Sequence, residues 1–208
     1  MVFISLFLFI YSIQSLGHTM TNFWVPYTRR GDKGVTYIPS YGRIPKHHPL
    51  VEVVGTLDEA ASSIMLAYSL TPVKCSKERE ILEWSARVLM RIIGIAILTG
   101  EYRERLDPME IERVINSITS RVEMPRGFIL PGGHPASASA HLARTIIRRL
   151  ERRMSSLREL VGEKTIPDEL LALTNRLSDL LYVVALSINK CTGFHEKILE
   201  KSITPPSV

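Results

Sequence analysis

Residues 77–98 carry an apolar repeat with the period of an α-helix. Apolar side chains return there every three or four positions and so share one helix face. They are Ile81, Leu82, Trp84, Val88, Leu89, Ile92, Ile93 and Ala96. Similar repeats predict four further helices, at 56–70, 107–122, 135–160 and 167–190. No segment alternates convincingly with period two, so we expect an all-α fold, a five-helix antiparallel bundle.

Local signals predict where these helices begin. Thr56 with Glu59 three residues later matches a capping box, in which each side chain satisfies a backbone N–H at a helix start. Asp58 would then lie in the first turn, where the helix dipole favours a negative charge. Asp107 followed by Pro108 predicts the start of the third helix. One interpretation of Asp58 is therefore purely structural: its charge stabilises the start of the helix.

Proline and glycine mark the connections between the helices. The stretch after Ile38, "PSYGRIPKHHP", is interpreted as a loop. "MPRGFILPGG" is interpreted as a pinned loop, because its apolar run 128–130 has no strand partner in view. The last residues, 202–208, are expected to be disordered. The chain is thus divided into residues 1–19, a bundle domain over 20–193 and a tail over 194–208.

Residues 1–19 are apolar and uncharged. They are interrupted by polar residues, fall short of the about 20 apolar residues of a membrane span, and lack the basic start of a signal peptide. We prefer translation from Met20, with a secretory or membrane leader as the alternative. The 208-residue chain, 45% hydrophobic, is long enough for one domain with a sizeable core.

The charge and the cysteine content limit the possible binding partners and the redox compartment. The net charge of +5 suggests an anionic partner, but it does not separate nucleic acid from nucleotide. Cys75 and Cys191 lack the spacing of zinc ligands. We expect free, buried thiols in a reducing compartment, with a single disulfide as the alternative. The sequence contains no metal-ligand set.

The first candidate site is "YTRRGDKGVTYI", residues 27–38. Gly31 and Gly34 allow backbone N–H groups to turn toward an anion, and basic and hydroxyl side chains add donors. The pattern is neither a Walker A loop nor a dinucleotide fingerprint. Spacing alone leaves two interpretations, a phosphate cradle and a solvated turn.

The second candidate site is the basic run of the fourth predicted helix. Arg144 and Arg148 stand one turn apart on the same stripe as His141 and Glu151. Two guanidiniums could hold a phosphate chain between them, or they could form a solvated basic face. We assign to that solvated face the other arginines of the run, Arg149, Arg152 and Arg153.

The third candidate is a pair of polar residues on predicted helices. Asn175 lies mid-helix among leucines, where it gains nothing from helix propensity, and it forms a polar stripe with Asp179 and Tyr182. This stripe could face a ligand or the solvent. Asp58 could likewise bind a partner group instead of stabilising a helix end.

Four segments in order resemble one known family. "YTRRGDKGVT", "VEVVGTLDEA", "FILPGGHPASASAHLARTIIRRLERR" and "LTNRLSDLLYVVA" are similar to the PduO-type ATP:corrinoid adenosyltransferases, over roughly Tyr27 to Lys190. The resemblance implies a homotrimer of five-helix bundles, with ATP and the corrinoid bound at each subunit interface. It also implies that the N-terminal loop binds the nucleotide.

The resemblance carries residue roles. The loop that wraps the triphosphate corresponds to Thr28, Gly31, Asp32, Gly34 and Thr36, with Arg29, Arg30, Lys33 and Tyr37 as neighbours. The lysine of the following loop corresponds to Lys46. The nucleotide is further expected to contact Arg144, Arg148, Glu151 and Asn175.

Two further roles follow from the resemblance. Asp58 and Arg144 correspond to an ion pair across the subunit interface, and Phe128 corresponds to a phenylalanine on the lower face of the corrinoid. The sequence departs from the family in three places. His134 replaces the usual serine or threonine cap, His48 replaces an acidic residue, and the loop at 37–46 has one glycine where two are often found.

The implied reaction is transfer of the 5′-deoxyadenosyl group of ATP to the cobalt of cob(I)alamin, with release of triphosphate. We expect Mg²⁺ with the ATP, a cytoplasmic location, a reductase and a cobalamin-dependent enzyme as partners, and neither nucleic acid nor membrane. Two alternatives stay open. The bundle could bind ATP and corrinoid without turnover, or bind nucleic acid through its basic helix.

Overall fold

The computed structural model describes residues 27, 29–102 and 106–200. Its helices are α2 (Pro49–Leu70), α3 (Ser76–Arg87), the π-helical segment η1 (Val88–Gly94), α4 (Ile95–Thr99), α5 (Pro108–Thr119), α6 (Pro135–Val161) and α7 (Asp168–Thr192). Its strands are β1 (Val35–Ile38), β2 (Gly42–Pro45), β3 (Ile129–Leu130) and β4 (Lys197–Ile198). Residues 1–19, Thr28 and residues 202–208 lie outside the described part, so the predictions made for them stay untested.

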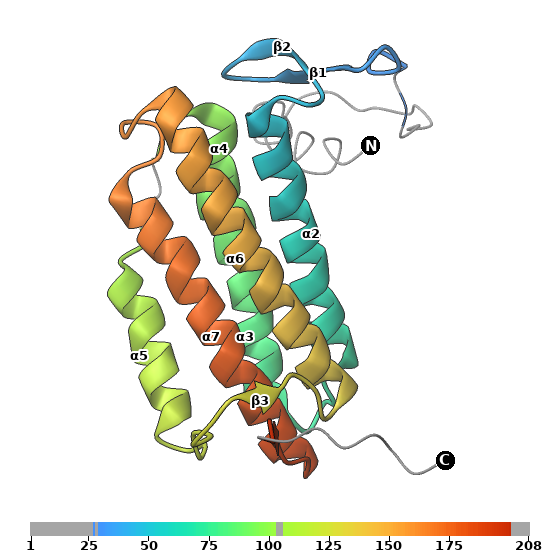
Figure 1. Ribbon diagram of the computed structural model, residues 1–208, viewed down its shortest axis with the longest axis vertical. Helices are drawn as coiled ribbons and strands as arrows, with labels where there is room; N and C mark the ends of the chain where they lie inside the picture. Colours follow the sequence, from blue (N-terminus) through green and yellow to red (C-terminus); the bar gives the residue numbers. More distant parts are fainter. Residues whose placement is uncertain (1–26, 28, 103–105, 201–208) are drawn as a thin grey trace, which may run out of the picture.

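The five predicted helices are confirmed, with α3, η1 and α4 forming one continuous rod (Figure 1). The chain runs along the bundle axis and reverses direction from α2 to α3 and from α6 to α7, whereas α5 and α7 run the same way. The hairpin of β1 and β2 lies beyond the N-terminal end of α2. The pair β3 and β4 lies at the opposite end of the bundle.

The predicted start of the first helix is wrong. The helix α2 begins at Pro49, and His48 caps it by accepting a hydrogen bond from the Leu50 amide at Nδ1 (3.1 Å). The Thr56 hydroxyl instead donates to the Glu52 carbonyl inside the helix (2.7 Å). Proline at the first helical position is preorganised for the helix, which explains the earlier start. Asp58 therefore lies inside the helix, and the interpretation that its charge stabilises the helix start is wrong.

The predictions that residues 39–49 and 124–133 are loops are also wrong in part, because both segments contain a short strand. β1 and β2 form an antiparallel hairpin in which Val35 pairs with Pro45. β3 pairs with β4, so that Ile129 lies opposite Ile198. Strands this short give no alternating pattern. The partner of β3 comes from a segment far along the chain, which local sequence cannot indicate.

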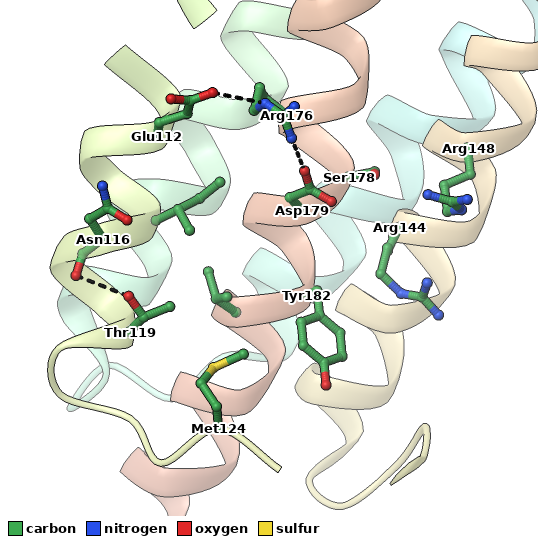
Figure 2. A pocket seen from close by; sticks show the side chains of 12 residues that line it. Glu112, Asn116, Thr119, Met124, Arg144, Arg148, Arg176, Ser178, Asp179 and Tyr182 are labelled. Carbon is green, nitrogen blue, oxygen red and sulfur yellow. Dashed lines mark hydrogen bonds and ion pairs between the residues drawn. The ribbon is translucent and has the colours of Figure 1, made fainter. Parts of the chain in front are cut away.

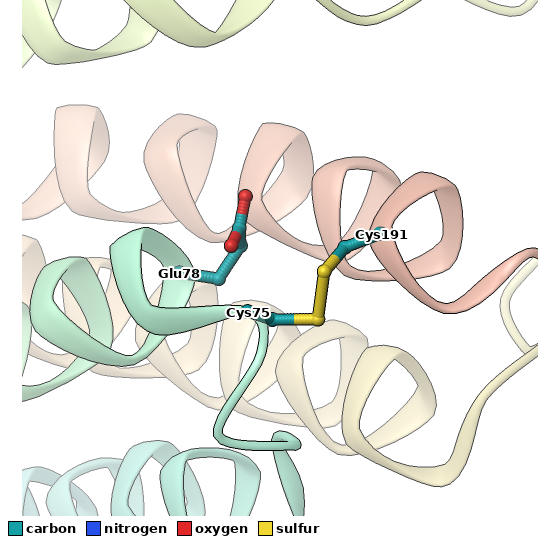
Figure 3. A group of neighbouring side chains, drawn as sticks. All are labelled: Cys75, Glu78 and Cys191. Atoms are coloured by element: carbon teal, nitrogen blue, oxygen red, sulfur yellow. A yellow bond between two sulfur atoms is a disulfide. The ribbon is translucent and has the colours of Figure 1, made fainter.

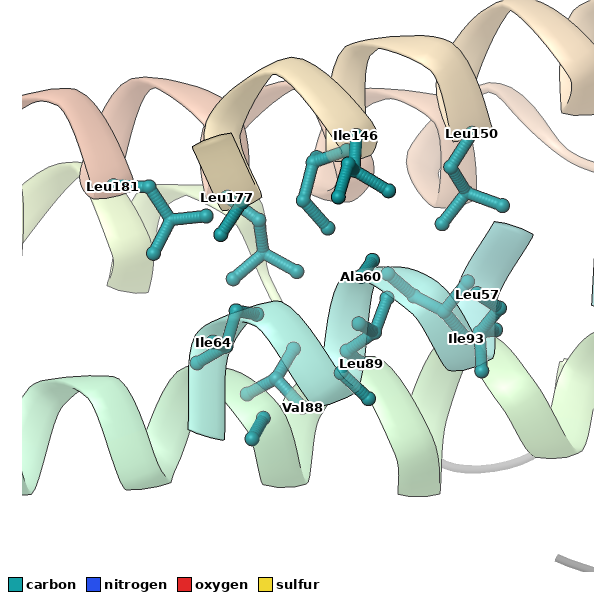
Figure 4. Close-up of a cluster of buried hydrophobic side chains, with 14 of the residues drawn as sticks. Leu57, Ala60, Ile64, Val88, Leu89, Ile93, Ile146, Leu150, Leu177 and Leu181 are labelled. Atoms are coloured by element: carbon teal, nitrogen blue, oxygen red, sulfur yellow. The ribbon is translucent and has the colours of Figure 1, made fainter. Parts of the chain in front are cut away.

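The core lies between α2, the α3–η1–α4 rod, α6 and α7, as Figure 4 shows. The labelled side chains from these elements include Leu57, Leu89, Leu150 and Leu177, and all are buried. α7 is long and apolar enough to cross a membrane by length and composition, but 67% of its most apolar window is buried in the bundle. Its apolar character is that of a core helix.

The two cysteines form a disulfide, so the prediction of free thiols is wrong (Figure 3). Cys75 precedes α3 and Cys191 lies in the last turn of α7, and the fold brings their Cα atoms within 6.0 Å. This separation is within the usual range for a disulfide. The buried Glu78 lies beside it and accepts a hydrogen bond from the Ser187 hydroxyl (2.6 Å). Because the sulfurs are bonded to each other, the group of Cys75, Glu78 and Cys191 offers no thiolate for a metal.

Candidate functional site

The loop before β1 folds back on Lys46. The Lys46 amide donates to the Gly34 carbonyl (2.8 Å), and a Cβ at Gly31 would lie 3.3 Å from the Lys46 ammonium nitrogen. Gly34 has a φ of +77°, which a side chain would strain. The structure thus brings two predicted glycines and the predicted lysine together.

The other predicted loop residues surround this turn. Arg29 lies over the Tyr27 ring, with 5.6 Å from the guanidinium carbon to the ring centroid. Asp32 and Lys33 are exposed, as is Arg30. Thr36 and Tyr37 continue into β1. The loop therefore presents its charges to the solvent beside the first turn of α2.

A cavity of about 470 Å³ lies along α5, α6 and α7 (Figure 2). Its polar lining includes Glu112, Asn116, Arg144, Arg148, Arg176, Asp179 and Tyr182. Figure 2 shows Arg144 and Arg148 on α6, which lies on the other side of α7 from α5. The predicted arginine pair thus lines a groove between helices.

Arg144 and Arg148 have no carboxylate partner among the residues that the structure describes. The Arg144 Nε atom is buried without a hydrogen-bond acceptor. Arg148 is exposed on the same stripe. A buried guanidinium nitrogen without an acceptor costs free energy unless a ligand or another chain supplies one.

The predicted solvated face is confirmed in part, because the side chains of Arg149 and Arg153 are 42% and 38% exposed but both form ion pairs. Arg149 forms an ion pair with Glu59, and Arg153 forms one with Glu52 at 3.0 Å. Both glutamates lie on α2, so these arginines connect α6 to its neighbour. Arg152 is exposed, as predicted, and donates to the Arg148 carbonyl (3.0 Å).

Asn175 is half-buried. Its Nδ2 atom donates to Glu151 Oε1 (3.0 Å), which connects α7 to α6. The second residue of the predicted polar stripe, Asp179, pairs with Arg176, whose Nε atom lies 3.0 Å from Glu112 Oε1. The sequence reasoning missed Arg176. Its spacing of three residues from Asp179 on a predicted helix was the available signal.

His141 is almost fully buried, and within the described part of the chain neither ring nitrogen has a hydrogen-bond partner. Burial, together with the nearby positive charge of Arg144, lowers its pKa from 6.5 to about 4. The ring is therefore neutral at pH 7. It lies 5.9 Å from the Tyr182 ring, centroid to centroid, behind the residues that line the groove.

Asp58 has no ionic partner in the described part of the chain. Burial, followed by the adjacent charge of Glu59, raises the pKa of its carboxyl group. Within one chain the predicted pair of Asp58 and Arg144 does not form. Each of these two charged groups is thus left available to a second molecule.

Phe128 lies at the other end of the bundle from the N-terminal loop. Its side chain is 85% exposed, although its backbone is held by the strand pair that follows. The structure therefore presents a large aromatic ring to the solvent. Such a ring on a fixed backbone is suited to a flat, apolar ligand face.

Together these features define a class of protein. It is a helical bundle with an arginine-lined groove for an anion, a separate glycine-rich basic loop and an exposed aromatic ring. Residues 26–188 match the cobalamin adenosyltransferase family. The chain belongs to this family.

Individual relatives agree with this assignment. A corrinoid adenosyltransferase of Bacillus subtilis is 31% identical, and the match covers 85% of this chain and 92% of the relative. The human corrinoid adenosyltransferase MMAB is 33% identical over 85% of this chain and 73% of the relative. The PduO enzyme of Citrobacter freundii is 34% identical over 76% of this chain, which spans only 48% of that protein's length.

Solved structures are also similar. A variant of a PduO-type ATP:corrinoid adenosyltransferase from Lactobacillus reuteri, complexed with cobalamin and ATP, aligns with a TM-score of 0.77 and 28% identity. The alignment covers 84% of this chain and 99% of that one. A second variant of the same enzyme, complexed with ATP, aligns with a TM-score of 0.75.

Proposed function

We propose that this chain transfers the 5′-deoxyadenosyl group of ATP to the cobalt of cob(I)alamin, forming adenosylcobalamin and releasing triphosphate. The observation that carries the proposal is the arginine pair. Arg144 and Arg148 line the groove without an ion-pair partner among the described residues, whereas Arg149 and Arg153 are paired with glutamates. A triphosphate supplies the missing negative charge and can accept bidentate hydrogen bonds.

The protein's part in this reaction is positioning and electrostatics. The reduced cobalt supplies the electron pair that bonds to C5′ of ATP, as the C5′–O bond breaks and its electrons leave with the triphosphate. No general base is needed. Positive groups that stabilise the leaving triphosphate, such as Arg144 and Lys46, lower the barrier.

We assign the nucleotide to the N-terminal loop and the arginine groove, with Asn175 holding Glu151 in place. Mg²⁺ would enter as part of the Mg-ATP substrate. The corrinoid is assigned to the surface at Phe128, whose exposed ring would keep water from the lower face of the cobalt. Exclusion of a lower ligand makes reduction of Co(II) easier, which favours the nucleophilic Co(I) state.

The active site is further proposed to lie between subunits of a homotrimer. Arg144 is 17 residues from the end of α6 on the hairpin side, which is about 25 Å of helix. The loop of the same chain therefore does not reach Arg144, but a neighbouring chain could supply both the loop and Asp58. This arrangement would also pair Asp58 with the buried Arg144 nitrogen.

Mixed trimers test this arrangement. We expect Asp58→Ala and Arg144→Ala to be inactive separately, and co-expression of the two variants to restore part of the activity. Restoration follows because some interfaces in a mixed trimer carry neither substitution. Failure to restore activity in verified mixed trimers would contradict the intersubunit pair.

A reductase that supplies the electron and a cobalamin-dependent enzyme that receives the product are proposed as partners, in the cytoplasm. The rival function, nucleic-acid binding through the basic run, is less well supported. Arg149 and Arg153 already pair with glutamates of α2, which removes charge from the face that the rival needs. Salt-sensitive binding to many DNA sequences would support nucleic-acid binding instead.

One assay tests the proposed reaction directly. Protein, Mg-ATP and chemically reduced cobalamin are mixed under anaerobic conditions, and the light-sensitive spectrum of adenosylcobalamin is followed with triphosphate release. We expect equimolar formation of the two products. Binding of both substrates without either product would support the non-catalytic alternative.

A further inference from the structure

Asn189 joins three parts of the chain at the base of the bundle. It lies in the last turns of α7 and is 1% exposed. Its Oδ1 atom accepts from the His134 amide (2.9 Å), and its Nδ2 atom donates to the Gly132 carbonyl (3.0 Å) and to Glu196 Oε1 (3.0 Å). Because a backbone N–H can only donate and a carbonyl can only accept, these partners fix the orientation of the amide.

Gly133 is fitted to this amide. Its φ of +95° is unfavourable for any side chain, and a Cβ there would lie 2.4 Å from Asn189 Oδ1. The backbone of the turn is thus pressed against the Asn189 side chain. The turn can be held in this way only when position 133 is glycine and the side chain at position 189 offers both a hydrogen-bond donor and an acceptor.

The held turn connects directly to Phe128. β3 begins one residue after Phe128 and pairs with β4, and the Leu199 amide donates to the Phe128 carbonyl (2.7 Å). Glu196, the third partner of Asn189, immediately precedes β4. One side chain therefore fixes both strands of the pair that positions the exposed ring.

The same contact fixes the start of α6. The His134 side chain caps this helix by accepting from the Ala136 amide at Nδ1 (3.2 Å), while its backbone amide is held by Asn189. Because α6 carries Arg144, the position of its first turn matters for the groove as well. Among the described residues, the hydrogen bonds of the Asn189 side chain reach the N-cap of α6 at His134 but no residue further along that helix.

We propose that Asn189 is a positioning residue for the corrinoid, acting through the backbone of residues 128–134. This inference rests on the proposed function, which assigns the corrinoid to Phe128. Asn189 should govern corrinoid binding and change ATP binding much less, because it hydrogen-bonds to Gly132, His134 and Glu196, whereas the proposed nucleotide contacts Arg144 and Arg148 lie ten or more residues beyond His134 on α6.

The first test is kinetic. For Asn189→Leu, which removes all three hydrogen bonds at similar size, we expect the KM for reduced cobalamin to rise about tenfold. The KM for ATP should stay within about twofold. The matched control is Thr192→Val, because among the described residues the Thr192 hydroxyl donates only to carbonyls of its own helix. Equal effects on both substrates would overturn the proposal.

A milder pair of variants keeps the test open if Asn189→Leu fails to fold. Asn189→Asp retains an acceptor for the His134 amide but sets a carboxylate against Glu196. Adding Glu196→Gln restores a donor at that contact. We expect the double variant to bind cobalamin more tightly than Asn189→Asp alone, and the absence of any such rescue would count against the proposal.

The second test does not depend on turnover. In Asn189→Leu, hydrogen exchange of residues 127–134 and 194–199 should become faster, while exchange in the middle of α2 and α6 stays unchanged. Titration with cob(II)alamin measures corrinoid affinity in the same proteins. If the unsubstituted protein binds corrinoid but forms no adenosylcobalamin, the proposed reaction fails and the positioning role stands. Unchanged exchange or unchanged corrinoid affinity in the variant overturns the positioning role.

Discussion

One buried side chain, His141, should contribute to the destabilisation of this protein by acid. Its pKa falls from 6.5 to about 4 on folding, because burial and the charge of Arg144 disfavour the protonated ring. As the pH drops below 6.5, His141 is therefore protonated in the unfolded chain but stays neutral in the folded chain. Stability from this source is complete above pH 6.5 and is lost progressively down to about pH 4.

The magnitude follows from the size of this shift. One pKa unit corresponds to about 1.4 kcal/mol, so His141 should remove about 3 kcal/mol from the free energy of unfolding between pH 7 and pH 4. About 1 kcal/mol of this should be lost by pH 5.5. Other groups also titrate in this range. The contribution of His141 is therefore isolated by comparison with His141→Leu, which has no ring to protonate.

The assay is denaturant unfolding at a series of pH values and one fixed protein concentration, followed by tryptophan fluorescence. The control is His47→Gln, because His47 is exposed in the loop before α2. We expect the control to follow the unsubstituted protein and His141→Leu to lose less stability between pH 6.5 and pH 4. Parallel curves for His141→Leu and the unsubstituted protein would refute the reasoning.

Three further predictions concern activity and the disulfide. Reduction, or the double substitution of Cys75 and Cys191 by serine, should cost about 2–5 kcal/mol of stability in thermal or denaturant unfolding, and no change would mean that the bond does not form in solution. Phe128→Ala should bind ATP normally in a titration but form adenosylcobalamin from cob(II)alamin and a reductant at least about tenfold more slowly, since the lower face of the cobalt is no longer shielded and Co(II) becomes harder to reduce; a normal rate would exclude the lower-face role. Asp58→Ala and Arg144→Ala should each weaken trimer assembly and abolish activity, at a cost of about 3–5 kcal/mol per interface, and full activity in either variant would argue against a buried pair.

Helix content was predictable because it depends on short-range chemistry. The three-four spacing at 77–98, Asp107 as a cap and Gly193 as a terminator act within one or two turns of the chain. The start of α2 was missed for a related reason. Two local signals competed, and Pro49 with His48 prevailed over Thr56 with Glu59.

The site was predictable only in part. Arg144 and Arg148 could be singled out, but their distinction from Arg149 and Arg153 depends on where α2 places its glutamates. Asn175 could be identified as unusual, but its partner Glu151 lies on another helix. Asn189 could not be identified from the sequence, because no neighbouring residue in the chain indicates the turn that it holds.

The sequence by itself determined the helical class, the helix faces and the ordered motifs that resemble the family, since all of these are encoded in residues close together in the chain. The tertiary structure decided which charges remain unpaired, where β3 finds its partner and that Cys75 meets Cys191. These outcomes depend on the path of the chain between distant segments. Packing of the whole bundle fixes that path, and no single segment specifies it.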